Sequence, residues 1–299
     1  MSYTEDQLDY IDQVFDRANK LINARVWGEI KVHRLDTWRG CFKNFGAELV
    51  GAYLLDNLCF RSREQFFSLL DNLFLEVQID GGERECKDVI KLVQSRPNST
   101  TEALVRIAPV IGLHAPPTKS GPYILRLAQR RYGINSHWLS WPHHIESVKG
   151  LSQLIFVDDF CGTGQQFIEF AQSIRLSEMH SANNAMKISY FVAAAHEDGM
   201  NSIKQNLPFI QIKCAERLGP TNSVLQDKCF GRYQIKGFQD LVLQQYTDVL
   251  EGAGLPRVGK LAQGFGSLGL AYGFAHATPN NTLPIFWYET ESWTPLLDR

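Results

Sequence analysis

One stretch of sequence decides the fold: Leu154-Ile155-Phe156-Val157-Asp158-Asp159-Phe160-Cys161-Gly162-Thr163-Gly164. An apolar run stops abruptly at two adjacent carboxylates and a glycine-flanked threonine. Four consecutive large apolar residues, 154–157, predict a strand that is buried on both faces, as in the middle of a parallel sheet. The turn that follows lies at the carboxyl end of this strand, where open α/β sheets bind ligands.

The glycine-flanked threonine predicts an anion-binding loop. Gly162 and Gly164 let backbone amides approach a ligand closely. Residues 165–174 then continue as an amphipathic helix with one apolar stripe. Because the first N–H groups of a helix favour negative charge, its amino terminus would face an anion. Two carboxylates that accept hydroxyl hydrogen bonds, beside a phosphate loop, describe a site for a ribose 5-phosphate.

This segment resembles the motif with which type I phosphoribosyltransferases bind 5-phosphoribosyl 1-pyrophosphate (PRPP). In that motif an apolar strand leads to two acidic residues, two intervening residues and a short Thr-Gly loop. The resemblance implies that Asp158 and Asp159 bind the ribose 2- and 3-hydroxyls. It also implies that the 5-phosphate is held by Gly162, Thr163, Gly164 and Gln165.

Two positions depart from the family pattern. Gln166 stands where the family usually closes the loop with a small hydroxyl residue, which removes one expected phosphate contact. Gly162 stands where purine-salvage members carry a carboxylate that serves as the base. An ordinary strand, turn and helix with acidic residues at a solvated turn is the alternative interpretation.

Composition and charge exclude several classes of protein. The 299 residues suffice for one large domain or two ordinary ones. The net charge is −2 and charges of both signs are mixed along the chain, so the sequence gives no sign of a basic surface that would bind nucleic acid or an anionic membrane. Neither a membrane span nor a signal region is apparent, since the chain opens with Tyr3-Thr4-Glu5-Asp6. We therefore expect a soluble, cytoplasmic protein.

The six cysteines are scattered and form no CxxC pair, which disfavours a zinc site and a disulfide scaffold alike. We expect no metal site made by protein side chains alone. Cys161 lies inside the proposed loop, but no base is adjacent to it. We therefore favour a small packing residue there over a nucleophile.

Two regions differ in their periodicity. Residues 1–95 are expected to be all-helical, with capping boxes at Thr4/Gln7 and Ser62/Gln65 and a further helix over 47–58. Residues 96–299 are expected to form an α/β domain with a mostly parallel sheet, which the resemblance makes one of the type I phosphoribosyltransferase kind. The expected strands cover 105–113, 154–157, 187–195, 209–214, 269–275 and 284–288, and helices are expected over 122–131 and 236–250.

A turn-rich segment, 114–121, follows one expected strand and directly precedes a helix, so its position suits a second anion loop. Type I phosphoribosyltransferases hold the pyrophosphate of PRPP with such a loop. The resemblance therefore implies a pyrophosphate loop at Lys119, Ser120 and Gly121. A plain proline-rich connection with a solvated lysine is an equally open interpretation.

The run from 276 to 287 places many hydrogen-bonding groups between prolines. The side chains of Asn280, Asn281 and Thr282 could read the edge of a base or acceptor, and Phe286 or Trp287 could stack against it. A tight turn stabilised by Asx-type bonds is the alternative.

His196 ends the third expected strand of the α/β domain, on the same sheet edge as the acid pair. It could donate to a base or act as a general acid. A purely structural histidine in a turn is the other interpretation.

The ending of the chain, with Lys119-Ser120-Gly121 and Asp158-Asp159, resembles phosphoribosyltransferase-like proteins of prokaryotic conflict, or antiphage, systems. That implies a defence role with a protein partner from the same system. One hypothesis is a pentosyltransferase or nucleotide glycosidic-bond-cleaving enzyme acting at the ribosyl C1 of PRPP or a nucleotide, with Mg²⁺ carried on the substrate's phosphates. The alternative is a non-catalytic sensor or scaffold that binds PRPP or a nucleotide and regulates a partner. A nucleic-acid-binding component is a weaker third, because the charge is near neutral.

Overall fold

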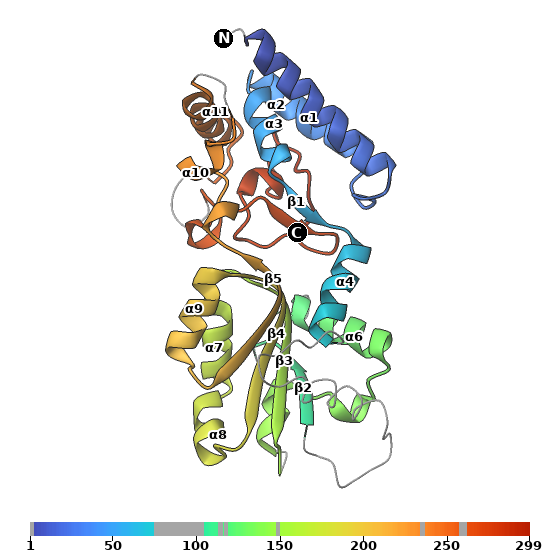
Figure 1. The fold of residues 1–299 in the computed structure, drawn as a ribbon, viewed down its shortest axis with the longest axis vertical. Helices are drawn as coiled ribbons and strands as arrows, with labels where there is room; N and C mark the ends of the chain where they lie inside the picture. Colours follow the sequence, from blue (N-terminus) through green and yellow to red (C-terminus); the bar gives the residue numbers. More distant parts are fainter. Residues whose placement is uncertain are drawn as a thin grey trace. The chain divides into compact units, whose positions relative to one another are not determined.

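The computed structural model describes residues 3–74, 105–112, 116, 119–147, 150–233, 237–256 and 262–299. The chain divides into two compact units (Figure 1). Unit 1 comprises Met1–Phe66 and Gly219–Arg299, and unit 2 comprises Phe67–Leu218. This grouping differs from the division expected at residue 95, because residues 219–299 pack with the amino-terminal helices and not with the sheet of unit 2.

Unit 2 is built on a four-stranded parallel sheet with the strand order β2-β3-β4-β5. Its strands are β2 (Val105–Pro109), β3 (Gln153–Cys161), β4 (Lys187–His196) and β5 (Ile210–Leu218). Each was expected from the sequence, and the parallel order confirms the α/β class. Because all four strands run the same way, their carboxyl ends share one edge.

Helices cover both faces of this sheet. Figure 1 shows α7, α8 and α9 on one face and α6 on the other. Their bounds are α6 Ser120–Tyr132, α7 Gln165–Ser173, α8 Leu176–Ala182 and α9 Glu197–Asn206, and two 3-10 helices, η1 (Ser136–Trp138) and η2 (Pro142–Ser147), lie between α6 and β3. The amphipathic helix expected from residue 165 is present as α7, and its apolar stripe packs on β3 and β4.

Strand β3 continues four residues beyond the expected end at Val157. Its ladder with β4 pairs Asp158 with Val192 and Cys161 with Ala195. The acid pair therefore lies inside a central strand and not in the turn after it. Backbone pairing on a neighbouring strand outweighs the local turn-forming tendency of the polar residues.

Unit 1 combines helices from both ends of the chain with a short two-stranded parallel sheet. Its elements are α1 (Glu5–Asn23), α2 (Val32–Asn44), α3 (Glu48–Asp56), β1 (Cys59–Arg61), α10 (Asp227–Phe230), α11 (Phe238–Gly252), η3 (Pro220–Asn222), η5 (Phe265–Ser267), β6 (Tyr272–Phe274) and η6 (Pro284–Phe286). Helix α4 (Arg63–Phe74) begins in unit 1 and ends in unit 2. None of the described helices has the length and apolar character that crossing a membrane requires.

Both expected capping boxes are present, at Thr4/Gln7 and Ser62/Gln65. Two expectations for unit 1 need correction. The region before residue 75 is not helical throughout, because β1 pairs with β6. The expected strand 284–288 is instead the 3-10 turn η6, since Pro284 suits the first position of a helical turn and its carbonyl accepts from Trp287 N–H at 3.0 Å. The expected turn at 95–99 lies outside the described residues.

The core of unit 1 joins the two ends of the chain through aromatic rings. Trp38 on α2 is fully buried and stacks on Phe286 with ring centroids 5.5 Å apart. Phe42 meets the rings of Trp38 and Trp293 edge-on, and the indole N–H groups of both tryptophans donate to the Ile285 carbonyl. Trp38 is therefore a packing residue of this core.

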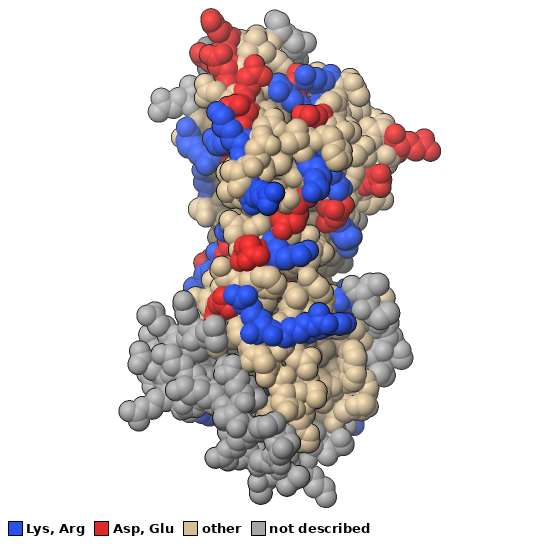
Figure 2. Space-filling view, turned by 90° about the vertical axis from the view of Figure 1, so that its right-hand side faces the viewer, with Lys and Arg blue, Asp and Glu red and all other residues tan. Residues whose placement is uncertain are grey.

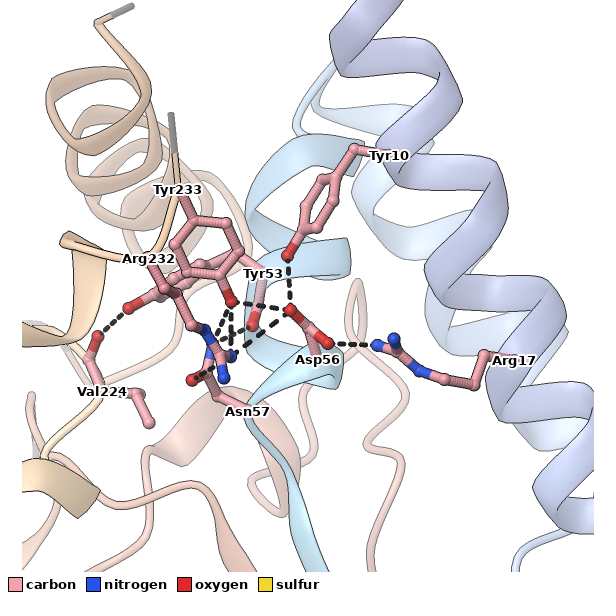
Figure 3. Close-up of polar contacts among 8 residues, drawn as sticks. All are labelled: Tyr10, Arg17, Tyr53, Asp56, Asn57, Val224, Arg232 and Tyr233. Atoms are coloured by element: carbon pink, nitrogen blue, oxygen red, sulfur yellow. Dashed lines mark hydrogen bonds and ion pairs between the residues drawn. The ribbon is translucent and has the colours of Figure 1, made fainter. Parts of the chain in front are cut away.

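A polar cluster around Asp56, at the end of α3, ties α3 to α1 and to the segment 232–233 (Figure 3). The Asp56 carboxylate accepts from Tyr10 at 3.2 Å and from Tyr233 at 2.7 Å. It also pairs with Arg17 and, at 3.4 Å, with Arg232. Burial raises the pKa of Tyr10, with Tyr233 and Asp56 adding to the effect, so the hydroxyl stays a donor.

Candidate functional site

The acid pair lies buried near the carboxyl end of β3. The exposed fraction is 2% for Asp158 and 7% for Asp159. The Asp159 backbone N–H donates to Asp158 Oδ1 at 3.0 Å. Two adjacent buried carboxyl groups are costly to keep, because both lose hydration and they repel each other. Such an arrangement is typical of a functional site more than of a solvated turn.

The Ser120 hydroxyl joins the pair from the first residue of α6. Its Oγ lies 2.7 Å from Asp159 Oδ1 and 3.4 Å from Asp158 Oδ1. Since one hydroxyl carries one proton, the shorter contact is the donated bond. The structure thus brings the expected pyrophosphate-loop residue Ser120 onto the expected ribose-binding carboxylates.

The neighbours of Ser120 have other roles. A Cβ on Gly121 would lie 2.8 Å from the Val110 carbonyl oxygen, so only glycine lets α6 start this close to the end of β2. Lys119 precedes the helix without capping it, and its side chain is exposed. Lys119 therefore remains a candidate for binding an anion.

The other oxygen of Asp158, Oδ2, faces the α7 side of the sheet. The Tyr190 hydroxyl on β4 and the Gln166 amide on α7 each lie 3.4 Å from it. The glutamine that departs from the family pattern thus contacts the acid pair. Burial, followed by the nearby Asp159 carboxylate, raises the pKa of Asp158 well above its ordinary value. The pair therefore tends to keep a proton that two exposed aspartates would release.

The proposed phosphate loop, 162–165, is held from beneath by α9. A Cβ built on Gly199, in the first turn of α9, would lie 2.2 Å from the Gly162 carbonyl oxygen. Gly164 has φ +79° and would meet Gly199 in turn at 2.6 Å. Only two facing glycines allow this approach, which fixes the loop against the helix. The side-chain amide of Gln165 donates to Glu169 at 2.6 Å. Gln165 can therefore contribute its backbone N–H, and not its side chain, to anion binding in the loop.

His196 ends β4 and caps α9. Its Nδ1 accepts from the Asp198 N–H at 3.2 Å, which leaves the proton of a neutral ring on Nε2. That Nε2 is buried and has no hydrogen-bond partner among the described residues. The capping bond supports the structural interpretation, and the unpaired Nε2–H keeps a donor role open.

Cys161 is a packing residue. Burial raises the pKa of its thiol to about 12, so the thiolate needed for nucleophilic attack is absent near neutral pH. Its sulfur would also lie 3.0 Å from a Cβ on Gly199, which places it under the loop.

The expected base-binding residues 280–282 belong to unit 1, whereas the acid pair belongs to unit 2. Asn281 donates to the Phe265 carbonyl at 2.7 Å, and Thr282 donates to the Tyr272 carbonyl. Both side chains are buried, whereas Asn280 is partly exposed. These bonds favour the turn-stabilising interpretation for Asn281 and Thr282.

The rings proposed to stack on a base also face inward. Phe286 is fully buried against Trp38, and the indole N–H of Trp287 donates to the Thr282 carbonyl at 2.9 Å. Neither ring has the open face that stacking on a ligand needs, so both contribute to the core of unit 1.

No group of three or more histidine, cysteine or acidic side chains that could hold a metal ion occurs among the residues the structure describes. The side chains near the loop that could act as metal ligands are the two carboxyl groups of the acid pair. Mg²⁺ commonly binds through one or two carboxylates and completes its shell with substrate phosphates and water. The acid pair fits an ion that arrives with its substrate.

Sequence reasoning missed three members of this site: the Tyr190 and Gln166 contacts with Asp158, and Gly199. Tyr190 lies inside an apolar run on β4 and pairs with Phe156, two residues before Asp158, so only the strand register brings its hydroxyl to the Asp158 carboxyl. Gly199 follows an Asp in a helix amino terminus, where glycine is unremarkable in a single sequence. No local pattern distinguishes any of the three.

Comparison with known proteins relates both units to one family. A sequence model of the PRTase-CE family matches residues 35–299. No curated protein matches the chain. Among solved structures, orotate phosphoribosyltransferase from Aeropyrum pernix matches at 12% identity with a TM-score of 0.26, over 44% of this chain and 70% of that one. On the family model, which spans most of its length, the chain belongs to the PRTase-CE family.

Proposed function

We propose that unit 2 binds the ribose 5-phosphate part of PRPP or a nucleotide and acts at the ribosyl C1. The observation that carries this proposal is the Ser120 hydroxyl, 2.7 Å from Asp159 at the edge of the glycine loop. A hydroxyl of the protein already occupies a position on the acid pair that a sugar hydroxyl would take. The phosphorylated end of the sugar would then reach the loop and the amino terminus of α7.

The protonation of the pair suits a diol. With its raised pKa, Asp158 can donate to one ribose hydroxyl while Asp159 accepts from the other. As the bond at C1 breaks, positive charge develops on the sugar, and the remaining negative charge of the pair would stabilise it. Mg²⁺ bound to the substrate's phosphates would neutralise the departing group. Lys119 would approach the same phosphates.

Calorimetric titration with PRPP, with and without Mg²⁺, tests the binding step. We expect saturable binding that the variant Asp158→Asn with Asp159→Asn loses by at least about tenfold. Glu178→Gln is the matched control, because this exposed side chain on α8 pairs with a surface arginine and makes no other hydrogen bond or ion pair among the described residues. Equal binding by wild type and the double variant would refute the proposed site.

Catalysis requires a separate measurement. Incubation with labelled PRPP or nucleotides should release pyrophosphate or free base at a rate that the double variant abolishes. A pentosyltransferase needs an acceptor, whereas glycosidic-bond cleavage proceeds with water alone. Comparing turnover with and without added bases therefore separates the two reactions.

A non-catalytic sensor is the second candidate, and the loop favours it. Gly162 offers no carboxylate as a base, and His196 is buried with Nδ1 committed to capping α9. Binding without turnover, coupled to a change in assembly state with a partner, would identify this function.

We also infer a role in antiphage defence, which the resemblance to conflict-system proteins supports. Bacteria that carry the gene with its neighbours should plate phage less efficiently than bacteria that carry the Asp158→Asn, Asp159→Asn variant. Equal plating on both strains would refute a defence role for this site.

A further inference from the structure

A pocket of about 470 Å³ opens beside α6 in unit 2, next to the end of β2. Its walls are one side of α6, the end of β2 and the segment 139–141. Leu139 continues the sheet past β2 through a bridge to Ile107. The volume lies within the range of small-ligand sites.

The pocket lies on the opposite side of α6 from the acid pair. The residues of α6 that line it run from Pro122 to Arg130 at helical spacings of three and four, so they share one stripe. Ser120 and Arg131 fall roughly halfway around the helix, and Ser120 reaches Asp159 from there. The helix therefore separates the pocket from the proposed ribose site.

Two arginines on this stripe have no partner among the residues that the structure describes. Arg126 and Arg130 make no hydrogen bond or ion pair with any residue that the structure describes. Their neighbour Arg131, in contrast, binds both oxygens of Asp71 at 2.6 and 2.5 Å. Figure 2 shows basic side chains lying next to one another on the side of the molecule that carries α6.

The spacing of these arginines suits an anion. Guanidinium groups four residues apart on a helix repel each other, and a phosphate between them would remove that repulsion. Gln129 lies on the same stripe and adds an amide that can donate or accept.

An aromatic ring completes the pocket. The exposed fraction of Trp141 is 49%, whereas none of the other five tryptophans exceeds 7%. An indole open to solvent beside guanidinium groups offers a flat face for a base, and Leu125 and Leu139 add apolar surface to the pocket wall.

We propose that this pocket is a second ligand site that binds a nucleoside 5′-phosphate, with the phosphate on Arg126 and Arg130 and the base against Trp141. The nucleotide can be free or part of a single strand, because both present the same groups. The site does not depend on the function proposed for the acid pair.

Tryptophan fluorescence tests this directly, because Trp141 is the accessible indole. We expect saturable quenching when a nucleoside monophosphate is added to the full-length protein, with excitation at the red edge of indole absorption. The variant Arg126→Gln with Arg130→Gln should bind about tenfold more weakly or worse. Both side chains are exposed, so this change should not unfold the protein.

Three variants show whether the quenching arises at this pocket. Lys204→Ala removes an exposed charge on α9, over the other face of the sheet, and should leave the quenching unchanged. Asp158→Asn with Asp159→Asn should also bind the nucleotide normally at this pocket. Trp141→Phe, made together with Asp158→Asn and Asp159→Asn so that the acid pair does not contribute, should abolish the quenching while calorimetry still detects binding.

Different ligands show which chemical groups of a nucleotide the pocket recognises. PRPP has no base and should not quench Trp141, and inorganic phosphate should compete only weakly. Short single-stranded oligonucleotides in a parallel titration show whether a free or a strand-borne nucleotide is preferred, and a preference for either supports the proposal. Absence of nucleotide quenching, quenching unchanged in the double arginine variant, or quenching lost with the acid pair would each overturn it.

Discussion

At the scale of single residues, Asp158 is an ionisable group in a buried position, where its charged form lowers the stability of the folded protein. Its raised pKa means that the folded state binds more protons than the unfolded state between the ordinary aspartate pKa and the raised one. The free energy of unfolding therefore falls as pH rises through this window and recovers as pH is lowered. A group that costs stability at neutral pH fits a functional role.

We predict that Asp158→Asn makes the protein more stable at neutral pH, by about 0.5–2 kcal/mol. The amide carries no charge to bury and can still bond to the Tyr190 hydroxyl. The advantage should shrink as the pH is lowered towards about 4, where the carboxyl of the unfolded chain is protonated as well. Urea unfolding of both proteins at several pH values measures it. A variant that is less stable than wild type at every pH would contradict this account of Asp158.

Gly199 gives a second prediction at this scale. In Gly199→Ala the new Cβ would meet the Gly162 carbonyl oxygen at 2.2 Å, which is not a possible contact, so the phosphate loop must move. We expect a loss of about 1–3 kcal/mol in unfolding free energy and weaker PRPP binding. Thermal unfolding and calorimetry measure the two effects.

Gly112→Ala is the matched control, because a Cβ there meets no atom of the described residues within 4 Å and the residue has no positive φ. It should change neither property by more than about 0.5 kcal/mol. If Gly199→Ala behaved like this control, α9 would not be what holds the loop.

At the scale of elements, the cluster around Asp56 predicts how α1 and α3 are held together. Asp56→Ala should lower the free energy of unfolding by about 2–3 kcal/mol, because the half-buried hydroxyls of Tyr10 and Tyr233 lose a charged acceptor. Arg17→Ala should cost less than about 1 kcal/mol, since this side chain is 56% exposed. Denaturant unfolding compares the two, and equal losses would mean that the ion pair dominates.

Elements with local signals were predictable from the sequence. The capping box at Thr4/Gln7 and the apolar stripe over 165–174 predicted α1 and α7, because a helix satisfies its hydrogen bonds within its own segment. Apolar runs predicted the strands of unit 2, and the signal is clearest for β2, β3 and β4, whose burial on both faces makes their sequences almost continuously apolar.

Elements that depend on distant partners were not predictable. β1 is three residues long and exists because it pairs with β6, more than two hundred residues later. The extension of β3 through Asp158 and Asp159 likewise depends on its ladder with β4. For the site, residue types identified the acid pair and its loop, but the contact between Ser120 and Asp159 needs the packing of α6 on β3.

At the scale of the whole molecule, the sequence suggested a boundary at residue 95, whereas the contacts assign the carboxyl-terminal residues to the amino-terminal helices. Periodicity distinguishes helical from α/β segments, but it cannot show that Phe286 and Trp293 fill the core that Trp38 begins. The division into units depends on side-chain fit over a long sequence separation.

This division predicts the behaviour of fragments. A fragment of residues 96–299 should expose the aromatic core of unit 1, bind a hydrophobic dye and aggregate. A fragment of residues 67–218 keeps its whole sheet and should unfold cooperatively without binding the dye. Dye binding and thermal unfolding of the two fragments provide the comparison, and a soluble, dye-free 96–299 fragment would contradict the grouping.

The aromatic core shared by the two ends of the chain also imposes an order of events during synthesis. All of unit 2 is synthesised before residues 219–299 exist, so the sequence of its sheet is complete while unit 1 still lacks its carboxyl-terminal part. At about 5–20 residues per second, the roughly 80 remaining residues take some 4–16 seconds to make. Throughout that interval the part of α2 that carries Trp38 and Phe42 lacks Phe286 and Trp293 and is open to chaperones.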